Sequence, residues 1–251
     1  MIFLAVYAVA DLHGRLDLFR QIQTFLNDSD KLYVIGDVID RGPEPWKLLK
    51  AVLKDPRCTL MKGNHEDMCY YGMKEILHGD YFGDYGSMWF RNGGDVTFSK
   101  LIEDENFTAF LPVLKGLILE INYTNQDGTK IILNHSGFYT PSKEKPSADD
   151  LIWDRKQYKN YFNHDWDGPE DVIIVHGHTP IPLIVKEYEK MKKMATHPEN
   201  FKPFDYEDGA LWYADNHKVN IDTGAVWTNQ TVVLDLDTFD EHIFYGGVNN
   251  G

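Results

Sequence analysis

The sequence predicts an α/β fold whose strand ends gather around a metal site. Short apolar runs alternate with amphipathic helical segments in the first quarter of the chain, a pattern typical of a sheet covered by helices. The first three runs each lead into a residue that can bind a metal ion, namely Asp11, Asp37 and Asn64. Because ligands in such folds bind outside the carboxyl ends of the strands, we expect these side chains to meet at one edge of the sheet.

The composition favours one globular domain, spanning residues 1–251. Of the 251 residues, 43% are hydrophobic, which is enough for a sizeable core. The net charge of −14 opposes nucleic-acid binding through a general basic face, although a local basic groove stays open as an alternative. The cysteines, Cys58 and Cys69, predict neither a disulfide framework nor a zinc site. We therefore expect reduced thiols in a cytoplasmic protein.

The apolar segment MIFLAVYAVA at the start is expected to form the first buried strand. It lacks the positive flank of a signal peptide and is too short to span a bilayer. It leads into Asp11 and His13, whose side chains point to the same side of an extended segment and could close on one metal ion. The apolar residues that follow have helical spacing and predict a helix packed on the sheet: Leu16, Phe19, Ile22 and Leu26.

Two further apolar runs, residues 32–35 and 59–61, are each followed by a glycine. Glycine accepts positive φ, so the chain can turn sharply there and place Asp37 or Asn64 at the rim of the sheet. Together with His65, these residues supply the mixed oxygen and nitrogen ligands that suit manganese, iron or zinc.

The segment between these two runs adds groups suited to phosphate. Asp40 and Arg41 follow Asp37 within one turn, and an arginine fork beside a cation site can bind phosphate oxygens with two hydrogen bonds. Pro43 and Pro45 then predict the start of a helix, which ends before the next strand.

Residues 67–115 differ in character and predict a helical insertion. Helical patterning covers residues 67–76, 96–102 and 107–114, and a segment rich in glycine and aromatic residues separates the first two. The insertion is either an ordinary helical subdomain or a cap that lines the substrate cleft. Arg91 and Asn92 are weak candidates for substrate contact, because only their glycine-rich setting supports them.

The second half predicts a further set of strands that carry histidines at their ends. Residues 116–123 and 129–134 form a hairpin pattern that leads to His135, and the strand at residues 171–175 runs into His176 and His178. A polar insertion at residues 187–208 is either a solvated helix face or a basic patch for an acidic substrate. The remaining predicted strands are residues 210–214, 218–222, 230–235 and 242–245.

Taken together, these motifs resemble the calcineurin-like metallophosphoesterases. The resemblance rests on DLHG at residues 11–14, GDVIDRG at 36–42, GNHE at 63–66, NHSG around His135 and HGHTP around His178. Within that family the chain is most similar to the phosphoprotein-phosphatase branch that includes bacterial and phage serine/threonine phosphatases and symmetrical diadenosine tetraphosphatases. The closing IDTGAVWTNQTVVLDLDT also resembles this branch, so the resemblance covers nearly the whole chain.

The resemblance implies a fold and a metal centre. The fold is a four-layer α-β-β-α sandwich of two mixed sheets. Two divalent metal ions are implied, with manganese expected and iron or zinc as alternatives. The implied ligands of the first ion are Asp11, His13 and Asp37, and those of the second are Asp37 as a bridge, Asn64, His135 and His178. A hydroxide held by both ions would attack phosphorus directly.

The resemblance also implies the remaining catalytic roles. Arg41 and Arg155 would bind the phosphate oxygens, and His65, oriented by Asp40, would protonate the leaving alkoxide. Histidine at position 176 departs from the family pattern, and it either supports the metal ligands or contacts the substrate.

Three functions follow from the resemblance and stay open at this point. The first is hydrolysis of phosphoserine or phosphothreonine in proteins, and the second is hydrolysis of dinucleoside polyphosphates or related nucleotides. The third, a binding protein without catalysis, is disfavoured because Asp37, Asn64, Arg41 and His65 are all present. We expect a monomer with a phosphoprotein or small phosphoester substrate, and neither nucleic acid nor a membrane as a partner.

Overall fold

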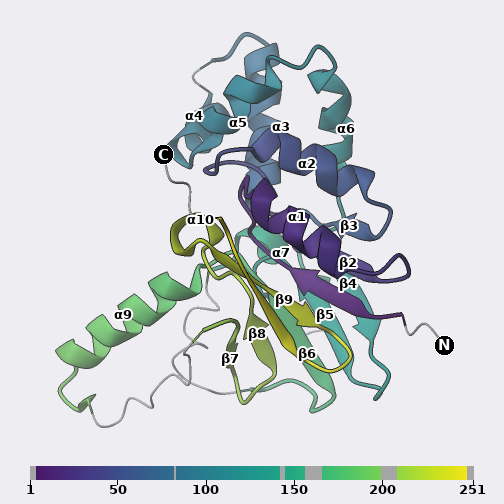
Figure 1. Cartoon of the computed structure of the whole chain (residues 1–251). Helices are drawn as coiled ribbons and strands as arrows, with labels where there is room; N and C mark the ends of the chain where they lie inside the picture. Colours follow the sequence, from purple (N-terminus) through teal and green to yellow (C-terminus); the bar gives the residue numbers. More distant parts are fainter. Residues whose placement is uncertain (1–3, 82, 142–144, 156–165, 199–207, 248–251) are drawn as a thin grey trace.

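The structure, a computed structural model, describes residues 4–81, 83–141, 145–155, 166–198 and 208–247. Three predictions fall partly outside these residues. They concern positions 1–3 of the first strand, position 82 of the helical insertion and positions 199–207 of the polar insertion. Within the described ranges the chain forms two five-stranded sheets with helices around them (Figure 1).

The first sheet combines the N-terminal strands with the last two strands of the chain. Its order is β10-β9-β1-β2-β3. Strands β1, β2 and β3 are parallel to one another, and β9 is antiparallel to both of its neighbours, β1 and β10. Two helices, α1 and α2, connect the parallel strands as predicted, and Pro45 opens α2. The elements are β1 (Val6–Val9), α1 (Leu16–Phe25), β2 (Lys31–Val34), α2 (Pro45–Lys54), β3 (Cys58–Leu60), β9 (Gln230–Asp235) and β10 (Glu241–Tyr245).

The second sheet has the order β4-β5-β6-β8-β7. The predicted hairpin is confirmed, because β4 and β5 are antiparallel, whereas β6 runs parallel to both β5 and β8. A short helix, α7, opens with Ser147, whose side-chain oxygen accepts the N–H of Asp150. The elements are β4 (Glu120–Thr124), β5 (Lys130–Asn134), α7 (Ala148–Trp153), β6 (Val172–His176), β7 (Leu211–Tyr213), β8 (Lys218–Asn220) and α10 (Ala225–Thr228).

The apolar side chains of β1 alternate between two packed layers. Tyr7 and Val9 join the core formed with α1 and α2, whereas Val6 and Ala8 pack between the two sheets. Helix α9 (Ile181–Met194) buries Ile184 on the outer side of the second sheet. The molecule is therefore a four-layer α-β-β-α sandwich, as the family resemblance implied.

The helical insertion lies between β3 and β4. Its helices are α3 (Asn64–Leu77), α4 (Asp84–Arg91), α5 (Gly94–Leu101), η1 (Phe107–Ala109) and α6 (Phe110–Lys115). Helix α3 begins at Asn64, three residues before the helical pattern starts, because the Glu66 side chain accepts the N–H of Gly63 and closes the helix end. Helix α4 was not predicted. A Cβ on Gly72 would lie 3.1 Å from the Gly86 Cα, so these glycines allow α3 and α4 to approach closely.

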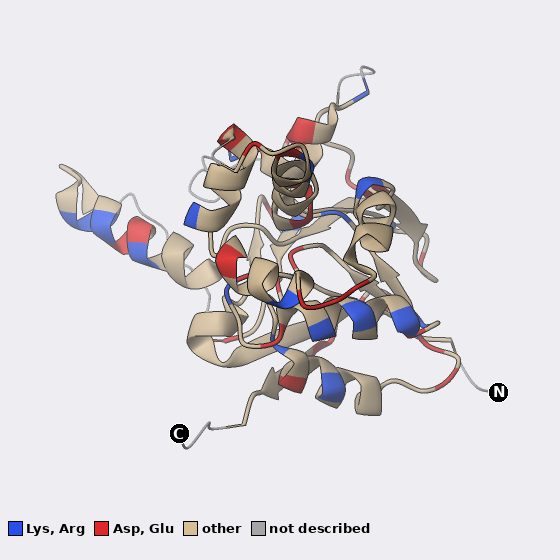
Figure 2. Ribbon diagram, turned by 90° about the horizontal axis from the view of Figure 1, so that it is seen from above, with Lys and Arg blue, Asp and Glu red and all other residues tan. Residues whose placement is uncertain are grey.

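The described part of the polar insertion is largely the end of α9. This helix begins at Ile181 and carries its lysines and glutamates on a segment that projects from the body of the protein (Figure 2). Most of these charged side chains are exposed, as a solvated helix face predicts. Among the described helices, none is both long and apolar enough to cross a lipid bilayer.

Candidate metal centre

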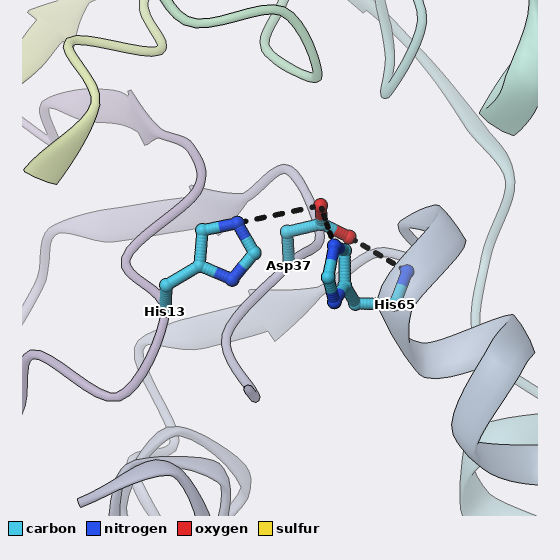
Figure 3. Close-up of side chains that lie close together, drawn as sticks. All are labelled: His13, Asp37 and His65. Carbon is cyan, nitrogen blue, oxygen red and sulfur yellow. Dashed lines mark hydrogen bonds and ion pairs between the residues drawn. The ribbon is translucent and has the colours of Figure 1, made fainter. Parts of the chain in front are cut away.

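Asp37 is the residue around which the predicted site gathers. It lies in the loop after β2, and its Oδ2 atom is 3.7 Å from Nε2 of His13 and 3.8 Å from Nε2 of His65. The backbone N–H of His65 donates to Asp37 Oδ1 over 3.0 Å (Figure 3). These residues follow three different parallel strands, so the expectation that the carboxyl ends of these strands meet is confirmed.

Asp37 also faces the second sheet. Its Oδ2 lies 3.4 Å from Nε2 of His135, and Asp11, Asp37 and His135 have ligand atoms within 4.8 Å of one another. Asn64 Oδ1 lies 3.0 Å from His135 Nε2 and 2.9 Å from His178 Nδ1. Asp37 is therefore shared by two groups of possible ligands, as a bridging carboxylate would be. The division of the other ligands between two ions stays a prediction.

Left-handed backbone turns aim most of these side chains into the site. Non-glycine residues rarely adopt positive φ, which costs about 1–3 kcal/mol at each position. The extended segment expected from Asp11 to His13 is therefore wrong, because a turn at each residue, rather than strand alternation, brings both side chains toward Asp37. Six of the ten predicted residues have φ between 39° and 72°: Asp11, His13, Asp37, Asp40, Arg41 and His178.

Two glycines permit close contact between loops. A Cβ on Gly63 would lie 2.1 Å from Asp37 Oδ1, and one on Gly177 would lie 1.9 Å from Asp11 Oδ2. Gly36 has the predicted positive φ, at 72°, but Gly63 is extended with φ of −101°. The sharp glycine turn expected before Asn64 is therefore wrong, and that glycine serves instead to admit the Asp37 carboxylate.

The buried carboxylate of Glu66 holds the loop that carries Asp37. Its oxygens accept the backbone N–H groups of Asp37, Val38 and Gly63 over 2.8, 2.9 and 3.0 Å. Burial raises the pKa of Glu66 to about 7, and the nearby charge of Asp37 raises it as well. The GNHE motif contains Glu66, but the sequence did not indicate this bracing role.

The helical insertion holds Asp40, which in turn orients His65. His65 Nδ1–H donates to Asp40 Oδ2 over 2.6 Å, so Nε2 is directed toward Asp37 and Arg41. Trp89 Nε1–H donates to the same carboxylate over 2.9 Å, and the Thr97 hydroxyl donates to its other oxygen. The sequence analysis missed Trp89 and Thr97, which lie 49 and 57 positions after Asp40 and share no local pattern with it.

Arg41 connects the two imidazoles of the first-sheet loops. Its two terminal nitrogens donate to Nε2 of His13 and to Nε2 of His65, each over 2.8 Å. From the helical insertion, the Asn92 carbonyl accepts the Arg41 Nε–H, and the Gly93 carbonyl accepts the backbone N–H of Arg41. A nitrogen that accepts a hydrogen bond cannot also bind a cation, so metal binding by His13 requires Arg41 to release it.

Arg155 follows α7 and is exposed. Burial lowers the pKa of His178 well below its usual value, and the positive charges of His135 and Arg155 lower it further. The positive charge of Arg155 therefore reaches His178, and the predicted binding of phosphate by Arg155 stays a prediction.

The centre concentrates buried negative charge. Burial raises the pKa of Asp11, and the charge of Asp222 raises it further. The pKa of Asp222 is itself raised to about 7, chiefly by burial. For Asp37, burial acts in the same direction, but the nearby positive charges of His135 and His65 outweigh it and hold the pKa well below its usual value. A positively charged group at this point would therefore stabilise the buried carboxylates.

The donor set fits divalent transition-metal ions. Carboxylate, imidazole and amide groups are their usual ligands, and a bound cation offsets buried carboxylates. His178 supplies a further indication, because its Nε2 is buried and has no hydrogen-bond partner among the described residues.

A family model for the calcineurin-like phosphoesterases matches residues 4–236. The chain belongs to this family. Serine/threonine-protein phosphatase 2 of Escherichia coli strain K12 is 34% identical to this phosphoesterase over 157 residues, which are 59% of this chain and 66% of that protein. The symmetrical bis(5'-nucleosyl)-tetraphosphatase of Buchnera aphidicola from Schizaphis graminum is 29% identical over 89 residues, a third of each chain.

The match to the solved structures supports the fold of this phosphoesterase. A protein provisionally assigned as a diadenosine tetraphosphatase superposes with a TM-score of 0.58 at 14% sequence identity, over 100% of this chain and 96% of that one. The phosphoesterase spans just under two thirds of the length of the E. coli relative and one third of the Buchnera relative.

His176 is a buried residue that packs against the loop after His135. It is fully buried, and its Nε2 lies 2.7 Å from the Tyr213 hydroxyl. A Cβ on Gly137 would lie 2.7 Å from the His176 ring, so the imidazole packs directly against the loop that follows His135. Of the two alternatives for His176, this position favours support of the ligand loops over contact with the substrate.

Proposed function

We propose that this phosphoesterase hydrolyses phosphomonoesters of serine and threonine in proteins. The observation that carries the proposal is the chain of contacts from Asp40 through His65 to Arg41, with distances of 2.6 and 2.8 Å. It places an imidazole beside a guanidinium that can bind phosphate, so that release of Nε2 by Arg41 would leave that nitrogen free to carry a proton for the leaving group. A serine or threonine alkoxide is a poor leaving group, so its departure requires such a proton donor.

Each of the ten predicted site residues has a task in this proposal. Asp11, His13 and Asp37 hold one cation, and Asp37, Asn64, His135 and His178 hold the other. Two bound divalent ions supply a water of lowered pKa and offset charge on the phosphate. Arg41 and Arg155 orient the phosphate and stabilise the charge that develops on its oxygens. Once Arg41 turns from His65 to the phosphate, Nε2 of His65 is free to carry a proton and give it to the leaving oxygen, and Asp40 keeps the imidazole in the required orientation.

We propose that the helical insertion contributes to catalysis because it holds Asp40 and Arg41 in position. Trp89 and Thr97 hold Asp40, and the backbone at Asn92 and Gly93 holds Arg41. A cavity of about 320 Å³ also opens between the helical insertion and α7, lined by Asp67, Asp84, Tyr85, Met88, Asp149 and Trp153. The contacts with Asp40 and Arg41 support our proposal that the insertion at residues 67–115 is a cap beside the substrate cleft.

Dinucleoside polyphosphates are the second candidate substrates. Relatives named as symmetrical bis(5'-nucleosyl)-tetraphosphatases support them, although the matched segment covers only a third of this chain. The same centre could cleave a phosphoanhydride, whose leaving group needs less help from His65.

The test is a hydrolysis assay of EDTA-treated protein with and without Mn²⁺. The substrates are a phosphoserine or phosphothreonine peptide, p-nitrophenyl phosphate and diadenosine tetraphosphate, and His65→Ala is the control variant. We expect Mn²⁺-dependent phosphate release from the peptide that falls by about a hundredfold or more in the variant. Preference for the dinucleotide would select the second candidate. Equal signals from parent and variant on every substrate would contradict an enzyme of this kind.

A further inference from the structure

Helix α9 extends beyond the part of it that packs on the protein. Its buried residues are Ile181, Ile184 and Tyr188. The structure describes every residue of α9, and none after Tyr188 is buried. Both views of the whole chain show this end of the helix projecting from the body (Figures 1 and 2). Short helices are marginal in water unless one face packs on another element, so a partner would stabilise the projecting turns.

The projecting helix also carries exposed apolar side chains. Leu183, Met191 and Met194 are 45%, 39% and 77% exposed. A groove of about 410 Å³ lies along the end of the helix and is lined by Glu187, Lys190, Met191, Met194 and Ala195. Methionine is common on surfaces that bind other proteins, because its flexible side chain adapts to the shape of the partner. The exposed face of α9 therefore has the character of a protein docking surface.

Four residues of this face form a straight row along the helix, which we call the outer row. They are separated by four, three and four positions: Leu183, Glu187, Lys190 and Met194. This is the spacing of residues that line the contact between two paired helices. At 3.6 residues per turn, the four lie within about 60° of one another around the helix axis. Glu187 Oε1 and Lys190 Nζ are 3.5 Å apart, but both side chains are exposed, so their contact adds little stability.

The outer row is complementary to itself when two copies of α9 run antiparallel. From Leu183 to Met194 the row is apolar, acidic, basic and apolar. In the antiparallel pair, Leu183 faces Met194 of the second copy, and Glu187 faces its Lys190. A two-fold axis repeats each contact, which gives two apolar contacts and two contacts of opposite charge. A parallel pair would instead place Glu187 against Glu187 and Lys190 against Lys190.

We propose that the outer row of α9 is a dimerisation surface, through which two copies of this chain pair their α9 helices antiparallel. The proposal is independent of the catalytic function and differs from the monomer expected from the sequence. A second copy suits the row better than a lipid surface does, because Glu187 would lie against anionic headgroups. It also suits the row better than a uniformly acidic partner, which would leave Glu187 opposite a like charge.

The projection of α9 lets two acidic chains approach each other. Each copy has a net charge of −14, so direct contact between the bodies is unfavourable. The 14 residues of α9 span about 20 Å, whereas physiological salt screens charges over about 8 Å. A contact along the projecting helix therefore keeps much of the acidic surface of the two bodies apart.

The experiment measures self-association of the metal-loaded full chain by sedimentation equilibrium at physiological ionic strength. We expect a dimer with a dissociation constant of about 10–100 μM, because two helices of this length form a small interface. Lys190→Glu places two carboxylates opposite each other twice, and Glu187→Lys does the same with two ammonium groups. We expect either variant to raise the dissociation constant about tenfold or more.

The matched control is Lys100→Glu on α5, which changes the net charge by the same amount as Lys190→Glu. Lys100 is also exposed and also forms a contact with a glutamate three positions away, between its Nζ and Glu103 Oε1 over 3.3 Å. Because Lys100 lies on the helical insertion and not on α9, we expect the dissociation constant of this variant to stay within about twofold of the parent value.

A mixture of the two α9 variants separates contact between copies from an effect within one helix. Each single variant loses its own contact between positions 187 and 190. In an equimolar mixture of Lys190→Glu and Glu187→Lys, however, each carboxylate of one chain faces an ammonium group of the other. We expect the mixture to form heterodimers about as tightly as the parent forms homodimers. Absence of heterodimers would overturn the proposed register.

Three outcomes overturn the inference. The first is a parent that stays monomeric up to about 500 μM, well above the expected dissociation constant. The second is a dimer that Lys190→Glu leaves unchanged, because such a dimer uses another face. The third is a monomeric parent that sediments with vesicles containing phosphatidylglycerol, which would assign the face to a lipid surface.

Thermal unfolding of each variant identifies any loss of folded protein. If a charge variant unfolds, Met194→Ser provides a second measurement. It removes an apolar contact from both halves of the pair, so we expect the dissociation constant to rise about tenfold. An unchanged value for Met194→Ser would equally overturn the inference.

Discussion

The loops of the first sheet and those of the second contribute to the site in different ways. The loops after β1, β2 and β3 provide seven of the ten predicted residues, including every carboxylate among them. The second sheet provides His135 and His178, and both residues form hydrogen bonds with the first-sheet loops. His135 Nδ1–H donates to the Ile35 carbonyl over 2.9 Å, and the His178 N–H donates to Asp11 Oδ2 over 3.0 Å. The first sheet therefore supplies the carboxylates of the site, and the second adds two imidazoles that we propose as metal ligands.

The buried groups that brace the two sets of loops also have opposite charge. Glu66 holds the first-sheet loop through three backbone N–H groups, and Lys218 of β8 holds the loop after His135 by donating to the Gly137 carbonyl over 2.9 Å. Lys218 is 1% exposed. Because the Glu66 brace contacts Asp37, the proposed bridging residue, directly, we expect changes in the first set of loops to affect turnover more than changes in the second.

The largest expected effect is that of Asp37→Asn. The substitution keeps the shape of the shared residue but removes its charge and one of its two oxygens, so it can no longer serve both ions as a carboxylate does. We expect kcat to fall about a thousandfold or more, with a much smaller change in thermal stability. Metal content and kcat are measured on the same preparation. An unchanged rate with two ions bound would disprove the bridging role.

Gly177→Ala tests how closely the second sheet must approach the first. The added Cβ would lie 1.9 Å from Asp11 Oδ2, so the His178 loop must move. We expect kcat to fall about a hundredfold, because a displacement of about 1 Å in a catalytic site has that effect. Gly247→Ala is the control, since a Cβ there meets no atom within 4 Å. Equal activity of the two variants would show that the two sets of loops are not in rigid contact.

Glu66→Gln tests the brace of the first set of loops. An amide supplies only one oxygen, and its NH₂ group would face backbone N–H donors. We expect metal affinity and kcat to fall about ten- to a hundredfold, as is typical for groups that orient metal ligands. The measurement is a metal titration followed by activity at saturating metal. Rescue of full activity by excess metal would locate the whole effect in binding.

Lys218→Met tests the brace of the second set and should have the smallest effect on turnover, about threefold or less at pH 7. Burial lowers the pKa of Lys218 to about 8 from the usual 10.5. Between pH 8 and pH 10.5 the Lys218 amine keeps its proton in the unfolded chain but has lost it in the folded chain. The stability of the parent relative to the variant therefore rises with pH in this range. We expect a rise of about 1–3 kcal/mol from pH 8 to 10, measured by denaturant unfolding. A constant difference would mean that Lys218 keeps its usual pKa.

The repeated strand and helix pattern and the residues at strand ends were predictable from local sequence. Alternation and helical spacing located β1, α1, β2, α2 and β3, and the motifs located Asp37, Asn64 and His65. Helix α4 escaped prediction because the glycines that resemble turn residues are used for packing against α3. The bracing residues Trp89 and Thr97 escaped because their partner, Asp40, is distant in the chain.

The sequence by itself determined which side chains were available and the order in which strands deliver them. Periodicity and motif spacing depend on neighbours along the chain, so they are visible without a structure. Only the tertiary structure decided that Asp11 and His13 turn left-handed and that Gly63 and Gly177 make room for carboxylates. These features arise where two sheets and the helical insertion meet, and contacts between segments far apart in the chain leave no local pattern.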